Sequence, residues 1–226
     1  MPNGPPGMNR YKYRILFSKT EAMRFTGHLD LFRAWERLLR RAQVPLAYSS
    51  GYHPHPKIQI GAALPLGVTG DNELVDIETA EECGVDALTR QIAEAVPPGV
   101  SDIRVTALPE NYPGLEKLVV AGDYFTVPLE GAWPADLPQK IESLLASANL
   151  LRERRGKAYD LRPRILSLAL DGNQLQMRLR LEPDATGRPD EVLSALGMES
   201  LPVLARRERL VLRESEGKMI GSEVLG

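Results

Sequence analysis

The order in which two kinds of hydrophobic pattern follow one another constrains this chain more than any other feature. Residues 11–19 alternate aromatic or apolar side chains with charged ones, a period of two that is typical of a half-buried strand. Residues 28–42 instead repeat apolar side chains every three or four positions, which predicts a helix. Extended segments at 57–60 and 73–78, a helix at 85–96 and a strand at 102–108 follow. The first half therefore predicts the order strand, helix, strand, strand, helix, strand.

The predicted helix at residues 28–42 has two unlike faces. Its expected apolar stripe consists of Leu29, Phe32, Trp35, Leu38, Leu39 and Ala42. Four arginines are expected on the opposite face: Arg33, Arg37, Arg40 and Arg41. Pro45 ends the helix, because proline lacks the amide hydrogen that a helix needs. Residues 46–48 and 57–60 then form either one interrupted strand or a hairpin around a turn rich in glycine and proline.

The second half repeats this order after residues 109–114, which contain proline and glycine. Its expected elements are extended chain at 117–127, a helix at 137–148, a strand hairpin at 164–181 around Gly172, a short helix at 189–196 and a strand at 203–212. Residues 64–70 are expected to be a loop. We therefore expect an α+β protein of two tandem ferredoxin-like modules with antiparallel sheets. The expected boundaries are a disordered tail at 1–10, one module at 11–110 and another at 115–226.

Composition is that of a globular protein with a core, since 43% of the residues are hydrophobic and 26% are charged. No apolar run approaches the roughly 20 residues that span a bilayer, and residues 1–7 lack the apolar stretch of a signal peptide. The single cysteine, Cys83, cannot form an internal disulfide, and by itself it cannot hold an iron–sulfur cluster or a structural zinc ion. We expect a cytoplasmic protein without cofactor or membrane partner.

Charge is segregated along the chain although the net charge is only −2. Residues 10–57 contain ten basic and three acidic side chains, whereas residues 58–110 contain two basic and ten acidic ones. A second basic stretch, residues 152–180, carries eight basic and three acidic side chains. Such segregation can create local positive potential that attracts anionic partners. Equally, the basic and acidic segments could neutralise each other in the folded protein.

All three histidines lie between residues 28 and 55. His28 is expected at the first helical turn, where the partial positive charge of the helix end disfavours a protonated imidazole. A neutral His28 could act as a base on a ribose 2′-hydroxyl, a reaction that needs no metal. The alternative is that His28 caps or packs against the helix.

His53 and His55 alternate with Pro54 and Pro56, which restrict the backbone to extended geometry. Two histidines could contribute to a metal site, but no nearby side chain supplies the third ligand that zinc needs. Tyr52, His53 and His55 could instead stack on unpaired bases while Lys57 contacts a phosphate. A purely structural turn is the competing interpretation.

Two sets of basic side chains could follow a phosphate backbone. On the predicted helix these are Arg33, Arg37, Arg40 and Arg41, although Asp30 with Arg33 and Glu36 with Arg40 have the spacing of ordinary helix ion pairs. The second set consists of Arg152, Arg154, Arg155, Lys157, Arg162 and Arg164. It could extend an RNA groove, but its local structure cannot be assigned from the sequence.

Residues 13–78 resemble a bacterial family known as radical-SAM-linked proteins, first catalogued as a domain of unknown function. Four segments carry the resemblance: Phe25 to Asp30, Arg37 to Ala42, Tyr48 to Ile58, and Leu64 to Val68. The family commonly has Phe-Asn where this chain has Tyr52 and His53. The resemblance implies a partner, a radical-SAM protein with a cobalamin-binding-like domain, and work related to RNA or the ribosome.

A weaker likeness is to the CRISPR-repeat-processing endoribonucleases, which also double a ferredoxin-like fold and place a histidine near the first helix. Their glycine-rich C-terminal loop is missing, since residues 217–221 are a poor substitute.

Three functions are therefore consistent with the sequence. The leading hypothesis is a non-catalytic accessory protein that binds ribosomal or transfer RNA and works with a radical-SAM enzyme. The alternatives are a metal-independent endoribonuclease that uses His28 and a protein-interaction module that docks the radical-SAM partner. The candidate RNA-binding or partner-docking residues are Arg33, Arg37, Arg41, Tyr52, His53, His55 and Lys57.

Overall fold

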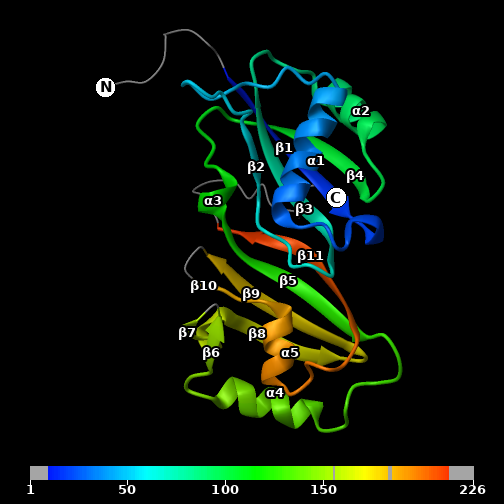
Figure 1. Ribbon diagram of the computed structural model, residues 1–226, viewed down its shortest axis with the longest axis vertical. Helices are drawn as coiled ribbons and strands as arrows, with labels where there is room; N and C mark the ends of the chain where they lie inside the picture. The colour runs from blue at the N-terminus through cyan, green and yellow to red at the C-terminus, as the bar shows by residue number, and fades with distance from the viewer. Residues whose placement is uncertain (1–9, 155, 183–184, 214–226) are drawn as a thin grey trace. The chain divides into compact units, whose positions relative to one another are not determined.

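The computed structural model describes residues 10–154, 156–182 and 185–213, so the expected tail, apart from Arg10, lies outside the described residues. The chain divides into two compact units, Met1–Leu118 and Val119–Gly226 (Figure 1). Both units combine helices with antiparallel strand pairs. The mixed α+β class expected from the sequence is therefore confirmed. No helix in the described ranges is long and apolar enough to cross a membrane.

The first unit contains the six elements that its sequence predicts. They are β1 Tyr11–Lys19, α1 His28–Arg41, β2 Ile58–Ile60, β3 Val68–Thr79, α2 Val85–Ala95 and β4 Val100–Leu108. The strands pair in the order β2-β3-β1-β4, and each pair is antiparallel. Strand β3 begins at Val68, inside the segment expected to be a loop. A single helical turn, α3 Leu115–Leu118, ends the unit where extended chain was expected.

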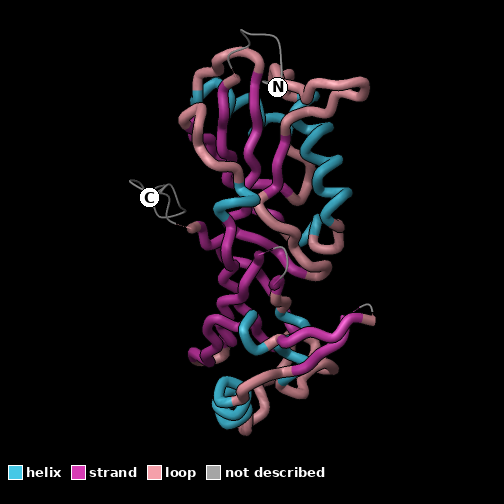
Figure 2. Tube along the Cα trace, turned by 90° about the vertical axis from the view of Figure 1, so that its left-hand side faces the viewer, coloured by secondary structure: helices cyan, strands magenta, loops and turns pink. Residues whose placement is uncertain are grey.

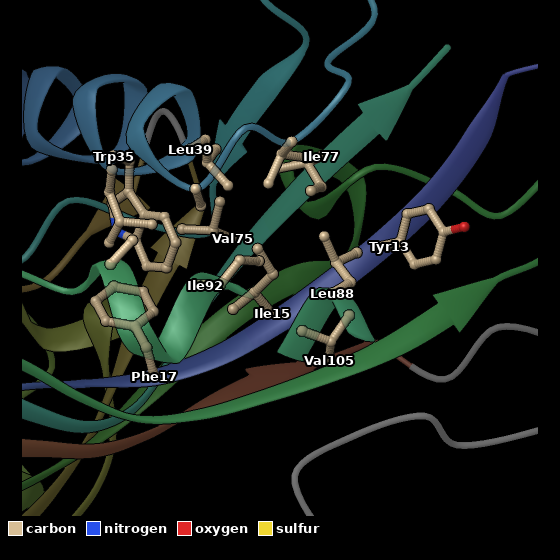
Figure 3. Close-up of a cluster of buried hydrophobic side chains, with 14 of the residues drawn as sticks. Tyr13, Ile15, Phe17, Trp35, Leu39, Val75, Ile77, Leu88, Ile92 and Val105 are labelled. Carbon is tan, nitrogen blue, oxygen red and sulfur yellow. The ribbon is translucent and has the colours of Figure 1, made fainter. Parts of the chain in front are cut away.

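Helices α1 and α2 cover one face of this sheet. Figure 3 shows Ile15 and Phe17 of β1 and Val75 of β3 buried against side chains of both helices. The rings of Phe17 and Trp35 meet edge to face, with centroids 4.8 Å apart, a favourable aromatic geometry. This contact fixes α1, and with it every candidate residue on that helix, to the sheet.

The apolar stripe of α1 differs from the predicted one at its first turn. Leu31 is buried, whereas Leu29 is 70% exposed and Phe32 is only half-buried. At 3.6 residues per turn, roughly 100° per residue, Leu29 lies half a turn away from Leu38. Leu29 therefore belongs to the arginine face of the helix, and the prediction for this residue was wrong.

The second unit contains β5 Val119–Pro128, α4 Leu137–Ala146, β6 Leu151–Arg154, β7 Lys157–Asp160, β8 Ile165–Asp171, β9 Gln174–Glu182, β10 Ala185–Thr186, α5 Pro189–Ala195 and β11 Val203–Leu212. Its main strands pair in the order β8-β9-β5-β11, and β10 also pairs with β9. The predicted hairpin is confirmed as β8 and β9, joined through Gly172 at a φ of 56°.

The hairpin β6–β7 was not predicted. Its strands pair from Leu151 with Asp160 to Arg154 with Lys157. Figure 2 shows it as a two-stranded ribbon that extends away from the sheet of its own unit. This hairpin holds part of the second basic stretch, whose local structure the sequence left open.

Candidate functional site

Residues 48–57 of the first unit form a loop closed by backbone hydrogen bonds, here called the aromatic loop. Tyr48 and Pro56 form an isolated antiparallel bridge. The Ser49 amide donates to the His55 carbonyl (2.8 Å), and the His55 amide donates to the Ser49 hydroxyl (2.9 Å). Of the two arrangements left open for this region, the structure has the hairpin-like excursion. The base of the loop is therefore held in place while its tip, residues 50–54, lies outside these bonds.

The aromatic loop presents its rings to solvent. Tyr52 is 96% exposed, and its ring meets that of His53 edge to face at 5.3 Å. His55 is exposed too, and Tyr48 is 50% exposed. Lys57 at the end of the loop is half-buried. Grouped exposed apolar surface is commonly found at interaction sites, which makes the aromatic loop a candidate site.

Helix α1 carries the other candidates. His28 is its first residue and is exposed, and no interaction of its imidazole with another residue is seen in the described ranges. Arg33 pairs with Asp30 at 3.4 Å, as its spacing predicts. The Arg41 guanidinium donates a hydrogen bond to the Ala95 carbonyl at the end of α2. Arg37 is exposed and makes no such contact within the described part of the chain.

A cavity of about 600 Å³ lies in the first unit and was not expected from the sequence. Its lining includes Lys12 of β1, Asp76 and Glu78 of β3, Lys57 just before β2, and Gln59 within β2. Residues 110–114, including Tyr112, complete the lining together with Glu116 and Lys117. The side chains from the strands lie on the sheet face opposite the helices, because they alternate with the buried residues of the core.

The cavity has a buried ion pair beside it. The Arg14 guanidinium donates two hydrogen bonds of 2.8 Å to the two carboxylate oxygens of Asp76. Burial raises the pKa of Asp76 above its ordinary value even though Arg14 acts to lower it. Arg14 Nη1 is buried and has no hydrogen-bond partner among the described residues.

The linker side of the cavity is tied to the sheet. Lys12 Nζ donates to the Tyr112 carbonyl at 3.3 Å. The Gln59 side chain accepts a 2.9 Å hydrogen bond from the Leu115 amide and donates one to the Glu116 carboxylate. These contacts place residues 110–117 beside Lys57 of the aromatic loop, although the sequence showed residues 109–114 only as the segment between the two halves.

Most of the second basic stretch is occupied by contacts within its own unit. Arg154 donates to Glu191 at 2.7 Å, and Arg162 donates two hydrogen bonds to the Leu145 carbonyl. Arg164 donates to the Thr186 carbonyl and lies 4.1 Å from the centre of the Tyr159 ring. Arg152 is half-buried, Lys157 is exposed, and Arg155 lies outside the described residues. The stretch therefore offers fewer cations to a ligand than its sequence suggests.

No group of three or more His, Cys, Asp or Glu side chains in the described residues is arranged to hold a metal. Residues 217–221, compared above with a nuclease loop, lie outside the described residues.

Sequence reasoning missed Lys12, Gln59 and Tyr112. Only Lys12 could have been found from the sequence, because it lies on the polar face of the alternating strand at residues 11–19. Nothing in the composition of residues 109–114 indicated that Tyr112 would lie over that face.

Fold and site together define an α+β protein that presents aromatic and cationic side chains from its first unit. The chain belongs to a family described as an uncharacterized protein conserved in bacteria (DUF2344), whose model matches residues 12–189. No curated protein matches the chain. Among solved structures, it is similar to an unknown protein from Galdieria sulphuraria, with 13% identity over 91% of this chain and 100% of that chain. The TM-score of 0.29 is too low to establish a common fold.

Proposed function

We propose that this protein is a non-catalytic accessory protein that binds RNA and works with a radical-SAM enzyme in the bacterial cytoplasm. The observation that carries the RNA part is the aromatic loop, where Tyr52 is 96% exposed and stands edge to face with His53. Flat exposed rings beside a lysine suit unpaired bases and their phosphates, because every base offers a face for stacking. Ribosomal or transfer RNA is the proposed substrate class.

We also propose a more specific fold, two tandem ferredoxin-like modules, and the order of the strands supports it. In the first unit the order is β4-β1-β3-β2. In the second it is β11-β5-β9-β8, with α4 between β5 and β8 and α5 between β9 and β11. Both orders match a doubled split β-α-β arrangement. The hairpin β6–β7 is then an insertion in the second module.

RNA binding is tested by fluorescence anisotropy with a labelled single-stranded RNA at fixed salt. Tyr52→Ala should weaken binding by about 1–3 kcal/mol, the usual contribution of one stacked base. Leu151→Ala is the control, because Leu151 is equally a large exposed side chain, at 70%, but lies on β6 of the second unit. Equal affinity of the wild-type protein and Tyr52→Ala would contradict the proposal.

Docking of a radical-SAM protein is the second candidate function. It is supported by an exposed apolar surface outside the aromatic loop. Phe25, Leu29 and Leu66 are 76%, 70% and 66% exposed. Arg24 Nε donates to the Gly67 carbonyl at 2.8 Å, and the Gly67 amide donates back to the Arg24 carbonyl. These bonds bring Phe25 and Leu66 together at the start of α1. Exposed apolar groups that cluster in this way are typical of protein interfaces.

Docking is tested by co-purification with a radical-SAM protein that carries a cobalamin-binding-like domain, the class of partner that the family resemblance implies. Leu66→Asp should abolish co-purification while leaving RNA affinity unchanged, because a charge cannot be buried in an apolar interface. Leu129→Asp, at a side chain that is 50% exposed in the second unit, is the control. Retention of the partner by Leu66→Asp would exclude this surface.

A further inference from the structure

The cavity of the first unit has the size of a small-molecule site. Its volume of about 600 Å³ lies within the roughly 300–1,000 Å³ that is usual for ligand pockets. Strands β1, β3 and β2 supply its floor, and residues 110–114 supply the opposite side. Tyr112 is half-buried there, and the Arg14 guanidinium carbon lies 5.4 Å from its ring centre. The aromatic ring is therefore held at the cavity by a cation–π contact.

Strand register places two lysines in one row across the floor. Lys12 of β1 is the register partner of Glu78 of β3. The Glu78 amide in turn donates to the Lys57 carbonyl at 3.0 Å. Lys12, Glu78 and Lys57 thus follow one another across neighbouring strands, which lie roughly 5 Å apart. Glu78 is the single carboxylate in this row, and Arg10 also approaches it at 3.5 Å.

The floor carries an excess of positive charge. Asp76 is already bound through both oxygens by Arg14, and Glu78 lies among Lys12, Lys57 and Arg10. Glu110, Glu116 and Lys117 line the linker side and are exposed, so water screens their charges. The half-buried lysines of the floor are screened less. Because Arg10 pairs with Glu78 and Arg14 pairs with Asp76, an anionic group is favoured at Lys12 and Lys57, the two lysines on either side of Glu78.

We propose that this cavity binds a nucleotide, with its phosphate at Lys12 and Lys57 and its base against Tyr112. A phosphate satisfies the positive floor, and a planar base suits the fixed aromatic ring. The exposed amide of Asn111, which also lines the cavity, can hydrogen-bond the edge of the base. The nucleotide is either a free mononucleotide or one unit of an RNA strand.

This inference goes beyond the proposed function, because apart from Lys57 the cavity residues lie outside the aromatic loop. Tyr52→Ala should therefore leave mononucleotide binding unchanged even where it weakens RNA binding. The experiment can therefore show separately whether RNA binds at the aromatic loop and whether a nucleotide binds in the cavity.

The test is isothermal titration calorimetry of the full chain with each of the four nucleoside 5′-monophosphates, and anisotropy with a single-stranded oligonucleotide. Lys12→Ala and Tyr112→Leu should each weaken binding at least tenfold, whereas Tyr112→Phe, which keeps the ring, should stay within twofold of the wild-type affinity. Lys157→Ala, at an exposed lysine of β7 in the second unit, is the control. Circular dichroism of each variant verifies its folding.

Binding of a mononucleotide that depends on Lys12 and Tyr112 supports a free nucleotide as ligand. Dependence of only the oligonucleotide affinity on these two residues supports a unit of RNA. Inorganic phosphate that binds as tightly as the nucleotides would overturn the role of Tyr112 and with it the proposal. Folded Lys12→Ala and Tyr112→Leu variants that bind both ligands like the wild-type protein would overturn it as well.

Discussion

At the scale of single residues, Gly51 limits the shape of the aromatic loop. Its φ of 131° is a conformation that residues with a side chain rarely adopt, although a Cβ at Gly51 would meet no atom within 4 Å. The restriction therefore comes from the backbone and not from the space around it. Any other residue would force the tip to change shape and would displace Tyr52 and His53.

We predict that Gly51→Ala weakens binding of single-stranded RNA, because forcing this backbone costs about 1–3 kcal/mol or rearranges the tip. Gly131→Ala is a matched control, since Gly131 also has a positive φ, 72°, and open space around its Cα. Anisotropy should separate the two variants, while urea denaturation should show similar losses of stability. Equal RNA affinities for both variants would mean that loop shape does not matter.

His28 allows a prediction about catalysis. Metal-free cleavage of RNA needs a base and an acid that act together, and within the described ranges His28 is exposed without a second such group in contact. We therefore expect labelled RNA to stay intact with the wild-type protein and with His28→Ala alike, as read on a denaturing gel. Cleavage by the wild-type protein that His28→Ala abolishes would restore the endoribonuclease hypothesis.

At the scale of elements, one aspartate in each unit links neighbouring strands by pairing with arginine, Asp76 with one arginine and Asp123 with two. Arg14 and Asp76 join β1 to β3, and both side chains are largely buried. Asp123 of β5 pairs with Arg178 of β9 at 2.7 Å and with Arg209 of β11 at 2.8 Å, but both arginines are more than a third exposed. The cost of breaking each pair should follow this difference in burial.

We predict that Asp76→Asn lowers the free energy of unfolding by about 3–5 kcal/mol, because it leaves the Arg14 charge buried without a counter-ion. The loss should be read from Trp35 fluorescence in urea, in a Trp133→Phe background that silences the second tryptophan. Replacing both partners, as in Arg14→Leu with Asp76→Leu, should recover most of the loss. No recovery in the double variant would mean that the charges themselves are needed.

The Asp123 pair predicts a pH dependence. Burial acts to raise the pKa of Asp123, but the hydrogen bonds from Arg178 and Arg209 outweigh it and hold the pKa below its ordinary value. The stabilisation is therefore complete above the unfolded pKa, about 3.9, and is lost as the pH falls through the lower folded pKa. The difference in unfolding free energy between the wild-type protein and Asp123→Asn should be constant near neutral pH and shrink below about pH 4.

Urea denaturation at a series of pH values measures this difference. Asp136→Asn is the control, because Asp136 pairs with Lys140 on exposed helix surface, where an ion pair contributes little. If the difference in unfolding free energy between the wild-type protein and Asp123→Asn grew as the pH fell, the pKa of Asp123 would be higher in the folded protein than in the unfolded chain.

Periodicity predicted the elements better than it predicted what lies on their surfaces. Strand β11 has the predicted bounds, and α1 ends one residue before the predicted end, because both patterns run for ten residues or more. The face of Leu29 was misjudged, since an apolar residue in a first turn does not show by itself which way it points. The hairpin β6–β7 carries mainly charged residues, so it has no alternating pattern. The cavity depends on the long-range approach of Tyr112 to Lys12, which no local pattern contains.

At the scale of the whole molecule, the charge count of the sequence overstates the cations that a ligand can reach. Twenty-eight basic side chains are present, but pairs such as Arg14 with Asp76 and Arg154 with Glu191 hold many of them within the protein. Near the aromatic loop and on α1, Lys57, Arg37 and Arg40 make no ion pair or hydrogen bond through their side chains within the described ranges. RNA affinity should therefore depend on few ionic contacts and largely on stacking.

Because few ionic contacts are expected, RNA affinity should depend only weakly on the salt concentration. About three phosphate contacts give a slope near −2 in a plot of log affinity against log salt for a single strand, a loss of roughly twentyfold between about 50 and about 200 mM. Anisotropy titrations across this range measure the slope, and Arg37→Gln should reduce it by about 0.7. Tyr52→Ala should lower affinity equally at every salt concentration, because stacking releases no counter-ions. A slope steeper than about −5 would instead require a basic groove with many contacts, and the arginines now bound within the protein would have to exchange their partners for phosphates.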